Sequence, residues 1–394
     1  MKRKVKITYF YMLFFLIVFT KPTFVDVMSE LALINFIYDG FRVILMGVIP
    51  VYYIWKRDYS KVVILISLLY VALFVSTYIN RGDIRSIILT SGTVITCSMF
   101  ADISMRKDKY SLFFAVESLF FIYVICNFFT LIIYPNGWFM SGDVNPDNWF
   151  LGNKNLFVMY HIPYLYSTFQ AKKLEMRKFN LLEYVGIAAT ILSTLIARSA
   201  TGIVGIMVFF LIYCLKELIK RSVTAFLGVM IALMVFVLIV LLDFERLFSF
   251  IIVGLLHKDL TLTVRTYVWD AAIQWFKSSP MYGVGVQFTD IAKQNMFGYY
   301  HPHCTYLYFL VFGGIVGGIL FSLIIWILSV KIDKADVRLS IPAVSMLWAI
   351  LMIYITEVYS RPELFFICFV TAWTLADKGG KKSISREMIY KLDE

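Results

Sequence analysis

Charged residues are scarce in this sequence. Only 16% of its 394 residues are Asp, Glu, Lys or Arg, whereas soluble domains contain about 25%. Hydrophobic residues make up 60%, and the mean hydropathy is +0.78. A soluble fold could not solvate this much apolar surface. Because a helix needs roughly 20 apolar residues to cross a bilayer, the chain has room for about a dozen spans. We therefore expect a single all-α polytopic membrane domain.

Cysteine is also rare, and its five residues are scattered, mostly inside apolar runs. Their spacing fits neither a disulfide framework nor a zinc site. We expect them to be small buried apolar residues. They are Cys97, Cys126, Cys214, Cys304 and Cys368.

Apolar runs divide the chain into twelve candidate transmembrane helices. The first run has no small-residue cleavage site and many spans follow it, so it indicates a first span rather than a signal peptide. The runs cover residues 7–20, 31–55, 62–79, 84–101, 110–134, 155–170, 181–197, 201–215, 224–242, 303–330, 339–356 and 362–376.

The Lys and Arg residues gather in alternate connections between these runs, which hold 25 of the 37. This asymmetry orients membrane proteins with their basic loops in the cytoplasm. Both termini are then cytoplasmic, and the net charge of +11 reflects insertion rather than nucleic-acid binding. The basic segments are 1–6, 56–61, 102–109, 171–180, 216–223, 331–338 and the tail 377–394.

Two connections on the opposite, outer side are long: 135–154 and 243–302. Long loops in a compact protein are usually functional or disordered. The second is too rich in aromatic and apolar residues for disorder, and a 3.6-residue period predicts a helix near 264–277. The apolar positions that share one face of this helix are Val264, Val268, Ala271, Ala272 and Trp275.

Several arginines lie on the outer side, where positive charge opposes the insertion rule: Arg81, Arg85, Arg198, Arg265 and Arg361. Guanidinium groups match phosphate oxygens, so these arginines indicate a multiply charged anionic ligand at the outer leaflet. The alternative for each one is a structural role, in which it extends to the membrane surface or pairs with a nearby carboxylate such as that of Asp83 or Glu363.

Four motifs in the second half of the chain resemble the bacterial O-antigen ligase and polymerase family of membrane glycan-transferring enzymes. In order, they are LGNKN at 151–155, LIARSATGIVGI around Arg198, VRTYVWDAAIQWFKSSPMYGVG around Arg265, and HPHCTYLYFLVFGGIVGGILF from His301. Together they cover roughly residues 150–325. Their order, and the long loop before the tenth helix, carry the resemblance.

The resemblance implies a GT-C-like fold and transfer of glycan from a polyprenyl-pyrophosphate donor to a sugar hydroxyl at the outer leaflet. Arg198 and Arg265 would stabilise the negative charge of the leaving pyrophosphate. His303 would accept the proton of the acceptor hydroxyl or position that hydroxyl. These three residues are the expected catalytic groups. Further substrate contacts are expected at Asn153, Asn155, His301, Tyr306, Trp269, Arg81, Arg85 and Arg361.

His301 and His303, two residues apart, could also form a metal-binding pair. No cluster of Cys or carboxylates near them in the sequence completes a ligand set, so we expect neither a metal nor a cofactor. Gly313/Gly317 and Gly314/Gly318 follow the G-x-x-x-G spacing of closely packed helices, which would hold the His303 end of this span rigidly.

The function expected is polymerisation of lipid-linked repeat units into surface polysaccharide such as O-antigen, capsule or exopolysaccharide. One alternative is a ligase that moves finished glycan to a different acceptor. A second is a transporter or glycan flippase, with Asp39, Arg42, Glu117 and His161 lining a central cavity. Asp39 and Arg42 are three residues apart, however, and are expected to pair with each other on the helix. The resemblance implies an undecaprenyl-pyrophosphate-linked oligosaccharide as partner, beside membrane lipid and the flippase and chain-length regulator of the same pathway. The expected location is the bacterial cytoplasmic membrane, with a single domain over 1–376 and a tail from 377.

Overall fold

The computed structural model describes residues 6–140, 147–242, 244 and 264–377. Within these ranges the chain is helical apart from its connections and one antiparallel pair of two-residue strands, β1 (Phe139–Met140) and β2 (Asp147–Asn148). The first half holds α1 (Ile7–Phe19), α2 (Thr23–Val27), η1 (Ser29–Leu31), α3 (Ala32–Lys56), α4 (Lys61–Ile79), α5 (Ile84–Ile133) and α6 (Val158–Glu175). The second half holds α7 (Leu181–Ile196), α8 (Ala200–Leu218), α9 (Ala225–Phe236), η2 (Val237–Leu241), α10 (Arg265–Ser278), α11 (Thr289–Asn295), α12 (Thr305–Asp333), α13 (Val337–Ile353) and α14 (Glu363–Leu375).

Each of the twelve apolar runs forms a helix, which confirms the all-α polytopic fold. Two of the runs meet in α5, which is interrupted at Asp108 by non-helical backbone. The Asp108 side chain accepts from the backbone N–H of Ser111 at 3.2 Å, as an N-cap does for a new helix. Five helices are individually long and apolar enough to cross a membrane: α3 with its preceding turn, α4, α5, α8 and α12. The number of spans stays a prediction.

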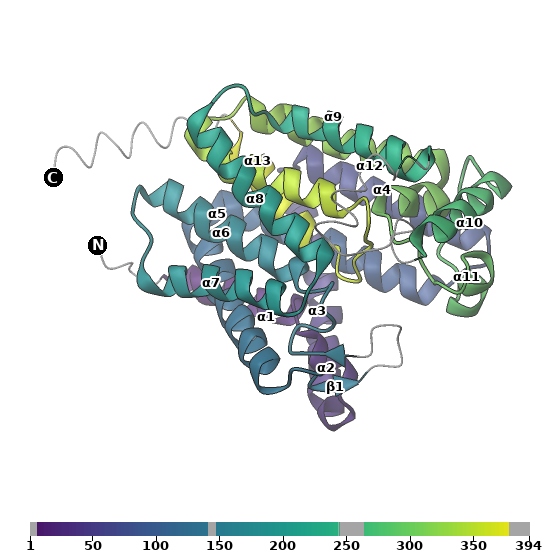
Figure 1. The fold of residues 1–394 in the computed structure, drawn as a ribbon, viewed down its shortest axis with the longest axis horizontal. Helices are drawn as coiled ribbons and strands as arrows, with labels where there is room; N and C mark the ends of the chain where they lie inside the picture. The colour runs from purple at the N-terminus through teal and green to yellow at the C-terminus, as the bar shows by residue number, and fades with distance from the viewer. Residues whose placement is uncertain (1–5, 141–146, 243, 245–263, 378–394) are drawn as a thin grey trace.

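Most helices run along the longest axis of the molecule (Figure 1). Described residues of the seven basic segments are linked, directly or through Thr374 of α14, at one end of the molecule, which we call the basic end. Polar contacts make the joins: Lys6 with Asp108, Arg106 with Asp58, Thr374 with Asp102, Lys173 with Glu217, Arg338 with the carbonyl of Lys173, and Lys331 with Asp377. The charge pattern predicts that these alternate connections lie on one side, and in the structure they do lie at one end.

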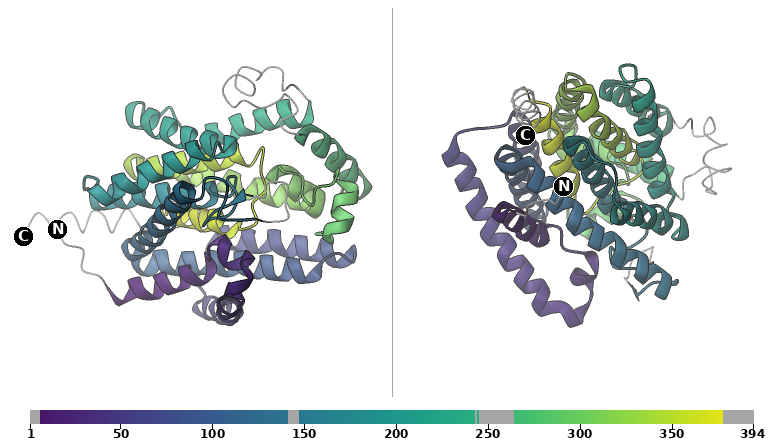
Figure 2. Two further views of the ribbon diagram at one scale, coloured as in Figure 1. Left: turned by 60° about the horizontal axis from the view of Figure 1, so that its bottom comes forward. Right: turned by 90° about the vertical axis from the view of Figure 1, so that its left-hand side faces the viewer.

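The opposite end, called the loop end, carries α10, α11 and the connections 20–31, 80–83, 197–199, 279–304 and 354–362 (Figures 1 and 2). Three helices that reach it are short. With 13, 17 and 13 residues, α1, α13 and α14 are roughly 20–25 Å long at 1.5 Å per residue. A hydrocarbon core is about 30 Å thick. We therefore expect the connections 20–31 and 354–362 to begin below the membrane surface, where irregular backbone persists only if protein covers it or it lines a polar cavity.

The helix that begins beside His303 is not the single straight span expected over 303–330. Gly314 has φ 65° and ψ −164°, and the backbone turns there. The rings of Phe309 and Phe321 stack at 4.4 Å, although a straight helix would separate these residues by about 18 Å. Residues 305–313 therefore fold back along the following turns of α12.

Three of the four glycines predicted to pack two spans together instead pack this returning segment. A Cβ on Gly317 would lie 2.7 Å from the carbonyl oxygen of Phe309, and one on Gly318 would meet the Leu310 side chain. A Cβ on Gly314 would overlap the Met281 carbonyl oxygen. Close packing by the G-x-x-x-G glycines is thus present. Gly314, Gly317 and Gly318 pack parts of α12 and a loop together, whereas a Cβ on Gly313 would lie 3.2 Å from the Leu73 side chain of α4, a contact between two spans.

The third helix differs from the others because it hardly enters the bundle. Figure 2 shows α3 on the flank of the molecule. Of its 25 residues, only Tyr53 is buried. One long face of α3 is consequently open to lipid or to another occupant.

Candidate active site

Arg265 is the first residue of α10, a helix in the place that the sequence predicts. The buried face of α10 is formed by Val268, Trp269 and Ala272. Val268 and Ala272 were expected there, whereas Trp275 is only partly buried and its ring packs on that of Phe312. Because α10 rests on α12 through this face, Arg265 is held at a fixed place at the loop end.

His303 lies in the tight turn that leads into α12. Its φ is 47°, in the left-handed region that few non-glycine residues adopt and that is enriched at functional sites. The backbone N–H of His303 donates to Nδ1 of His301 at 3.2 Å, and that of Thr305 donates to the carbonyl of Tyr354 at 2.8 Å. The turn is thereby fastened to the 354–362 connection.

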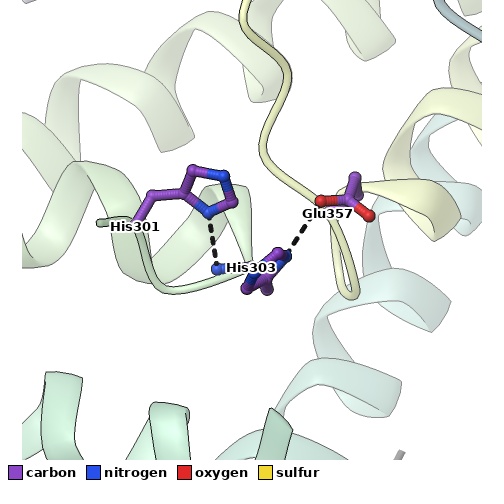
Figure 3. Close-up of side chains that lie close together, drawn as sticks. All are labelled: His301, His303 and Glu357. Carbon is purple, nitrogen blue, oxygen red and sulfur yellow. Dashed lines mark hydrogen bonds and ion pairs between the residues drawn. The ribbon is translucent and has the colours of Figure 1, made fainter. Parts of the chain in front are cut away.

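Glu357, in that connection, joins the two predicted catalytic residues. Its Oε1 lies 3.0 Å from Nδ1 of His303, and its Oε2 accepts from Nη2 of Arg265 at 3.0 Å. Figure 3 shows the imidazole of His303 beside the Glu357 carboxylate, with His301 on the other side of the turn. Thr305 fixes the backbone as well, since its Oγ1 donates to the Glu357 carbonyl at 2.7 Å. The sequence reasoning missed Glu357; an acidic residue at the end of an apolar run was the available signal.

The charges in this site favour an ionised Glu357. Burial of the carboxylate opposes ionisation, but the hydrogen bond from His303 and the positive charge of Arg265 outweigh it, so the pKa of Glu357 is lowered. Burial lowers the pKa of His301 to about 3. His301 is thus neutral at physiological pH, as its role as acceptor from the His303 N–H requires.

His301, His303 and Glu357 offer ligand atoms within 4.8 Å of one another, a spacing that could hold a metal ion. The contacts present favour another use. Both carboxylate oxygens of Glu357 are occupied, by His303 and Arg265, and Nδ1 of His301 accepts from the backbone. A guanidinium bonded to the same carboxylate also repels a cation. We therefore interpret the three residues as a hydrogen-bonded unit.

Arg198 is exposed at the junction of α7 and α8, with φ 51°. Its N–H donates to the carbonyl of Leu195, and that of Ser199 to the carbonyl of Thr194, the pattern of a left-handed helix end. No hydrogen bond or ion pair joins its side chain to the residues that the structure describes. A Cβ on Gly205 in α8 would lie 3.0 Å from Ile353, so Arg198 stands at the same end of the bundle as Glu357.

The arginines Arg81 and Arg85 are exposed at the junction of α4 and α5, and Arg361 is buried against Asp26. Asp83 caps α5 by accepting from Ser86 at 3.0 Å rather than pairing with an arginine. Within the described ranges, none of these arginines contacts His303. Their proximity to the catalytic residues stays a prediction.

The remaining expected substrate contacts have mixed surroundings. Asn153 accepts from the N–H of Asn155 at 3.0 Å in a local turn, and both are partly exposed. The hydroxyl of Tyr306 donates to the Leu351 carbonyl at 2.9 Å. Trp269 is fully buried and its indole N–H has no partner among the described residues, so substrate could reach it only if α10 moved.

The four groups proposed for a transporter cavity are held by separate partners. Asp39 pairs with Lys21 at 3.2 Å and lies 4.0 Å from Arg42, the pairing expected within α3. Glu117 lies 3.8 Å from Arg177 near the basic end, and His161 contacts Thr194 at 3.1 Å. These contacts do not bring the four side chains to one cavity.

A comparison with protein families agrees with the motifs. Residues 185–322 match the family model described as O-antigen ligase. This match includes Arg198, Arg265 and His303, whereas Glu357 lies beyond it. None of the curated proteins matches the chain. The match over residues 185–322 thus supports the O-antigen ligase and polymerase family that the motifs indicate.

Proposed function

We propose that this protein polymerises lipid-linked oligosaccharide repeat units into a surface polysaccharide. The donor is a glycan on undecaprenyl pyrophosphate, and the acceptor is a sugar hydroxyl of another lipid-linked repeat unit. The observation that carries the proposal is the hydrogen-bonded series Arg265–Glu357–His303 at the loop end. It supports the proposal because a histidine and a cation share one carboxylate, and both belong to residues 185–322, the range that matches the family model.

In the proposed reaction His303 is the general base. With Nδ1–H donated to Glu357, the ring keeps its lone pair on Nε2, the nitrogen that is free to take the hydroxyl proton. Glu357 thereby selects the tautomer and fixes the ring, as carboxylates do beside catalytic histidines. Glu357 is a positioning residue, since it acts through His303.

The bond changes balance without a metal or redox partner. The acceptor oxygen bonds to the anomeric carbon of the donor glycan as the bond from that carbon to the pyrophosphate oxygen breaks. The proton passes to His303, and polyprenyl pyrophosphate leaves with the electron pair. The developing negative charge lies near Arg265, whose remaining N–H groups are available, and Arg198 supplies a second cation in the same role. The enzyme is then a metal-independent glycosyltransferase.

The other residues singled out in the sequence have supporting roles in this proposal. Arg81 and Arg85 attract the pyrophosphates of the lipid-linked substrates to the loop end, and Arg361 contributes to substrate binding. His301, Tyr306 and Trp269 shape the pocket around the base, and Asn153 and Asn155 hydrogen-bond sugar. The loop end faces outward in this arrangement and the basic end faces the cytoplasm with both termini, in the bacterial cytoplasmic membrane. The flippase and chain-length regulator of the pathway are the protein partners.

A ligase is the second candidate, because the matching family model is described as O-antigen ligase. Donor chemistry is the same in the two reactions, and only the acceptor differs. Product analysis in a deletion strain separates them. Loss of the ladder of chain lengths supports a polymerase, and accumulation of full-length polymer not joined to its acceptor supports a ligase. An unchanged polysaccharide profile would contradict both.

A further inference from the structure

A second group of charged side chains lies between the bundle and α3. We call it the flank cluster: Lys21, Asp26, Asp39, Arg42, Arg361 and Glu363. Lys21 is 1% exposed and pairs with Asp26 at 2.6 Å and with Asp39 at 3.2 Å. Arg361 pairs with Asp26 as well. The connections after α1 and before α14, both of which we expect to begin below the membrane surface, thus meet in one ionic network.

The α3 side of this network is a polar stripe on an otherwise apolar helix. Asn35, Tyr38, Asp39 and Arg42 follow a helical spacing of three and four residues and so share one face. Asn35 accepts from Lys21, and the Tyr38 ring lies 5.8 Å from the Lys21 ammonium. The stripe therefore faces the cluster, while apolar side chains such as Leu33 and Phe36 on α3 are exposed.

Two of the three carboxylates of the cluster are exposed, whereas that of Glu363 and the cations are covered. The side chains of Asp26 and Asp39 are 36% and 53% exposed, against 10% for that of Arg361. Asp39 lies seven residues into α3, roughly 10 Å along the helix. An ionised carboxylate at that depth is costly against lipid and instead marks a cavity or a ligand. The exposed side of the Asp39 carboxylate must then face water or a polar occupant.

Two buried donors in the cluster have no partner among the described residues: Nη1 of Arg361 and Nε of Arg42. A buried polar group without a partner costs free energy, so such groups indicate a missing hydrogen-bonding ligand. Arg361 is 8% exposed, which makes its unused N–H a strong indication. The cluster therefore combines these unused donors with two exposed carboxylates, of which that of Asp26 also pairs through both oxygens, with Lys21 and with Arg361.

The balance of positive and negative charges in the cluster indicates which class of ligand it would bind. The three positive and three negative formal charges cancel, and the open carboxylates repel a pyrophosphate. A sugar ring suits the cluster, because each hydroxyl donates to a carboxylate and accepts from a guanidinium. Glu357 and Arg361 are four residues apart, so their Cα atoms are at most about 14 Å apart. A short oligosaccharide held at the cluster could present a hydroxyl to His303.

We infer that the flank cluster binds the acceptor glycan, with Asp26 and Asp39 accepting sugar hydroxyls and Arg361 donating to them. This inference rests on the proposed function, which makes the bound glycan the acceptor, and deepens it by naming where the acceptor binds. The glycan binds along the polar stripe of α3, and its reactive hydroxyl reaches the base across the 354–362 connection. The donor pyrophosphate binds on the Arg265 side. The cation there is not flanked by two exposed carboxylates, which would repel the pyrophosphate.

The test uses the full chain in detergent and the free repeat-unit oligosaccharide, released by mild acid from lipid-linked repeat units. Binding is measured by calorimetry for the wild type, for Asp26→Asn and for Asp39→Asn. Each variant should weaken binding at least tenfold. Lys21 keeps one carboxylate partner in either variant, so both should fold, and thermal unfolding verifies it. Glu30→Gln is the matched control, since Glu30 is exposed outside the cluster, and it should bind as the wild type does.

Two further arms identify the ligand and its role. Inorganic pyrophosphate should not displace the oligosaccharide. Displacement would show that the cluster binds anions rather than sugar, and it would overturn the inference. When the oligosaccharide is supplied as acceptor, the variants should lose transfer to it yet still cleave lipid-linked donor in water. Loss of donor cleavage in equal measure would contradict an acceptor role.

Failure of this inference is distinguishable from failure of the proposed function. If the wild type transfers no glycan but binds the oligosaccharide through Asp26 and Asp39, the proposed function fails and the sugar site remains. If the wild type and both carboxylate variants bind equally, or the wild type does not bind, the sugar site is wrong whatever the activity.

Discussion

Oε1 of Glu357 lies 3.0 Å from Nδ1 of His303, although 54 residues separate them in the chain. The same carboxylate holds Arg265, which is 92 residues away from it. One side chain therefore fixes the relative positions of the proposed base and the proposed pyrophosphate-binding cation.

The first prediction concerns Glu357→Gln. The amide has almost the same shape but offers one acceptor in place of two, so it cannot hold His303 and Arg265 together. Glycan transfer should fall by roughly 10²-fold or more, because carboxylates that orient catalytic histidines have effects of this order. The measurement is the initial rate of chain extension with lipid-linked repeat units in proteoliposomes.

The matched control is Glu217→Gln, which removes a carboxylate paired with Lys173 at the basic end. It should leave the rate of chain extension near that of the wild type. Equal losses in the two variants would mean that Glu357 contributes only to general stability, and its positioning role would be abandoned.

The second prediction concerns the turn that folds α12 back. Gly314→Ala places a Cβ at φ 65° and against the Met281 carbonyl, which should destabilise the protein by about 1–3 kcal/mol or more. Gly47→Ala in α3 meets nothing within 4 Å and should stabilise the helix by about 0.5–1 kcal/mol. Thermal unfolding in detergent compares the two, and a Gly314→Ala protein as stable as the wild type would rule out the fold-back.

The third prediction follows from His301. Its pKa is lowered from 6.5 to about 3, so the unfolded chain binds more protons between these values, and stability should fall as the pH drops through this window. Protonation of Nδ1 also removes the acceptor of the His303 N–H. The unfolding temperature should decrease between about pH 7 and pH 5, a range in which Glu357 stays ionised.

His301→Gln removes this titration. Its unfolding temperature should therefore change less than that of the wild type over the same pH range. Parallel curves for the two proteins would show that His301 does not stay neutral in the fold.

The fourth prediction concerns metals, since His301, His303 and Glu357 stand close enough to bind one. EDTA should change the rate of chain extension by less than about twofold if these residues work as a hydrogen-bonded base. A large loss restored by a divalent cation would make them metal ligands, and the role given to Arg265 would have to be revised.

Much of the fold is predictable from the sequence because hydrophobic runs and basic loops are local properties. The positions of α3, α4 and α13 follow from them closely. The fold-back of α12 does not, since an uninterrupted apolar run looks the same whether it is straight or turned. What decides the turn is the approach of Met281 to Gly314, a contact between distant parts of the chain.

The candidate site was only half predictable for a related reason. Arg265 and His303 lie in motifs that a single sequence displays. Glu357 lies in none of them, and its proximity to both depends on where α13 ends and α14 begins. The flank cluster is similar, because the pairing of Lys21 with Asp39 and of Asp26 with Arg361 joins separate helices. Only the Asp39–Arg42 spacing within α3 was visible beforehand.

The central claim is that His303 accepts the proton of the acceptor hydroxyl. Single-turnover glycan transfer by purified His303→Ala protein, with donor binding measured on the same preparation, tests it most directly. The predicted result is a loss of about 10²–10⁴-fold in the transfer rate with donor binding unchanged. Transfer at the wild-type rate would contradict the claim and the active site built around it.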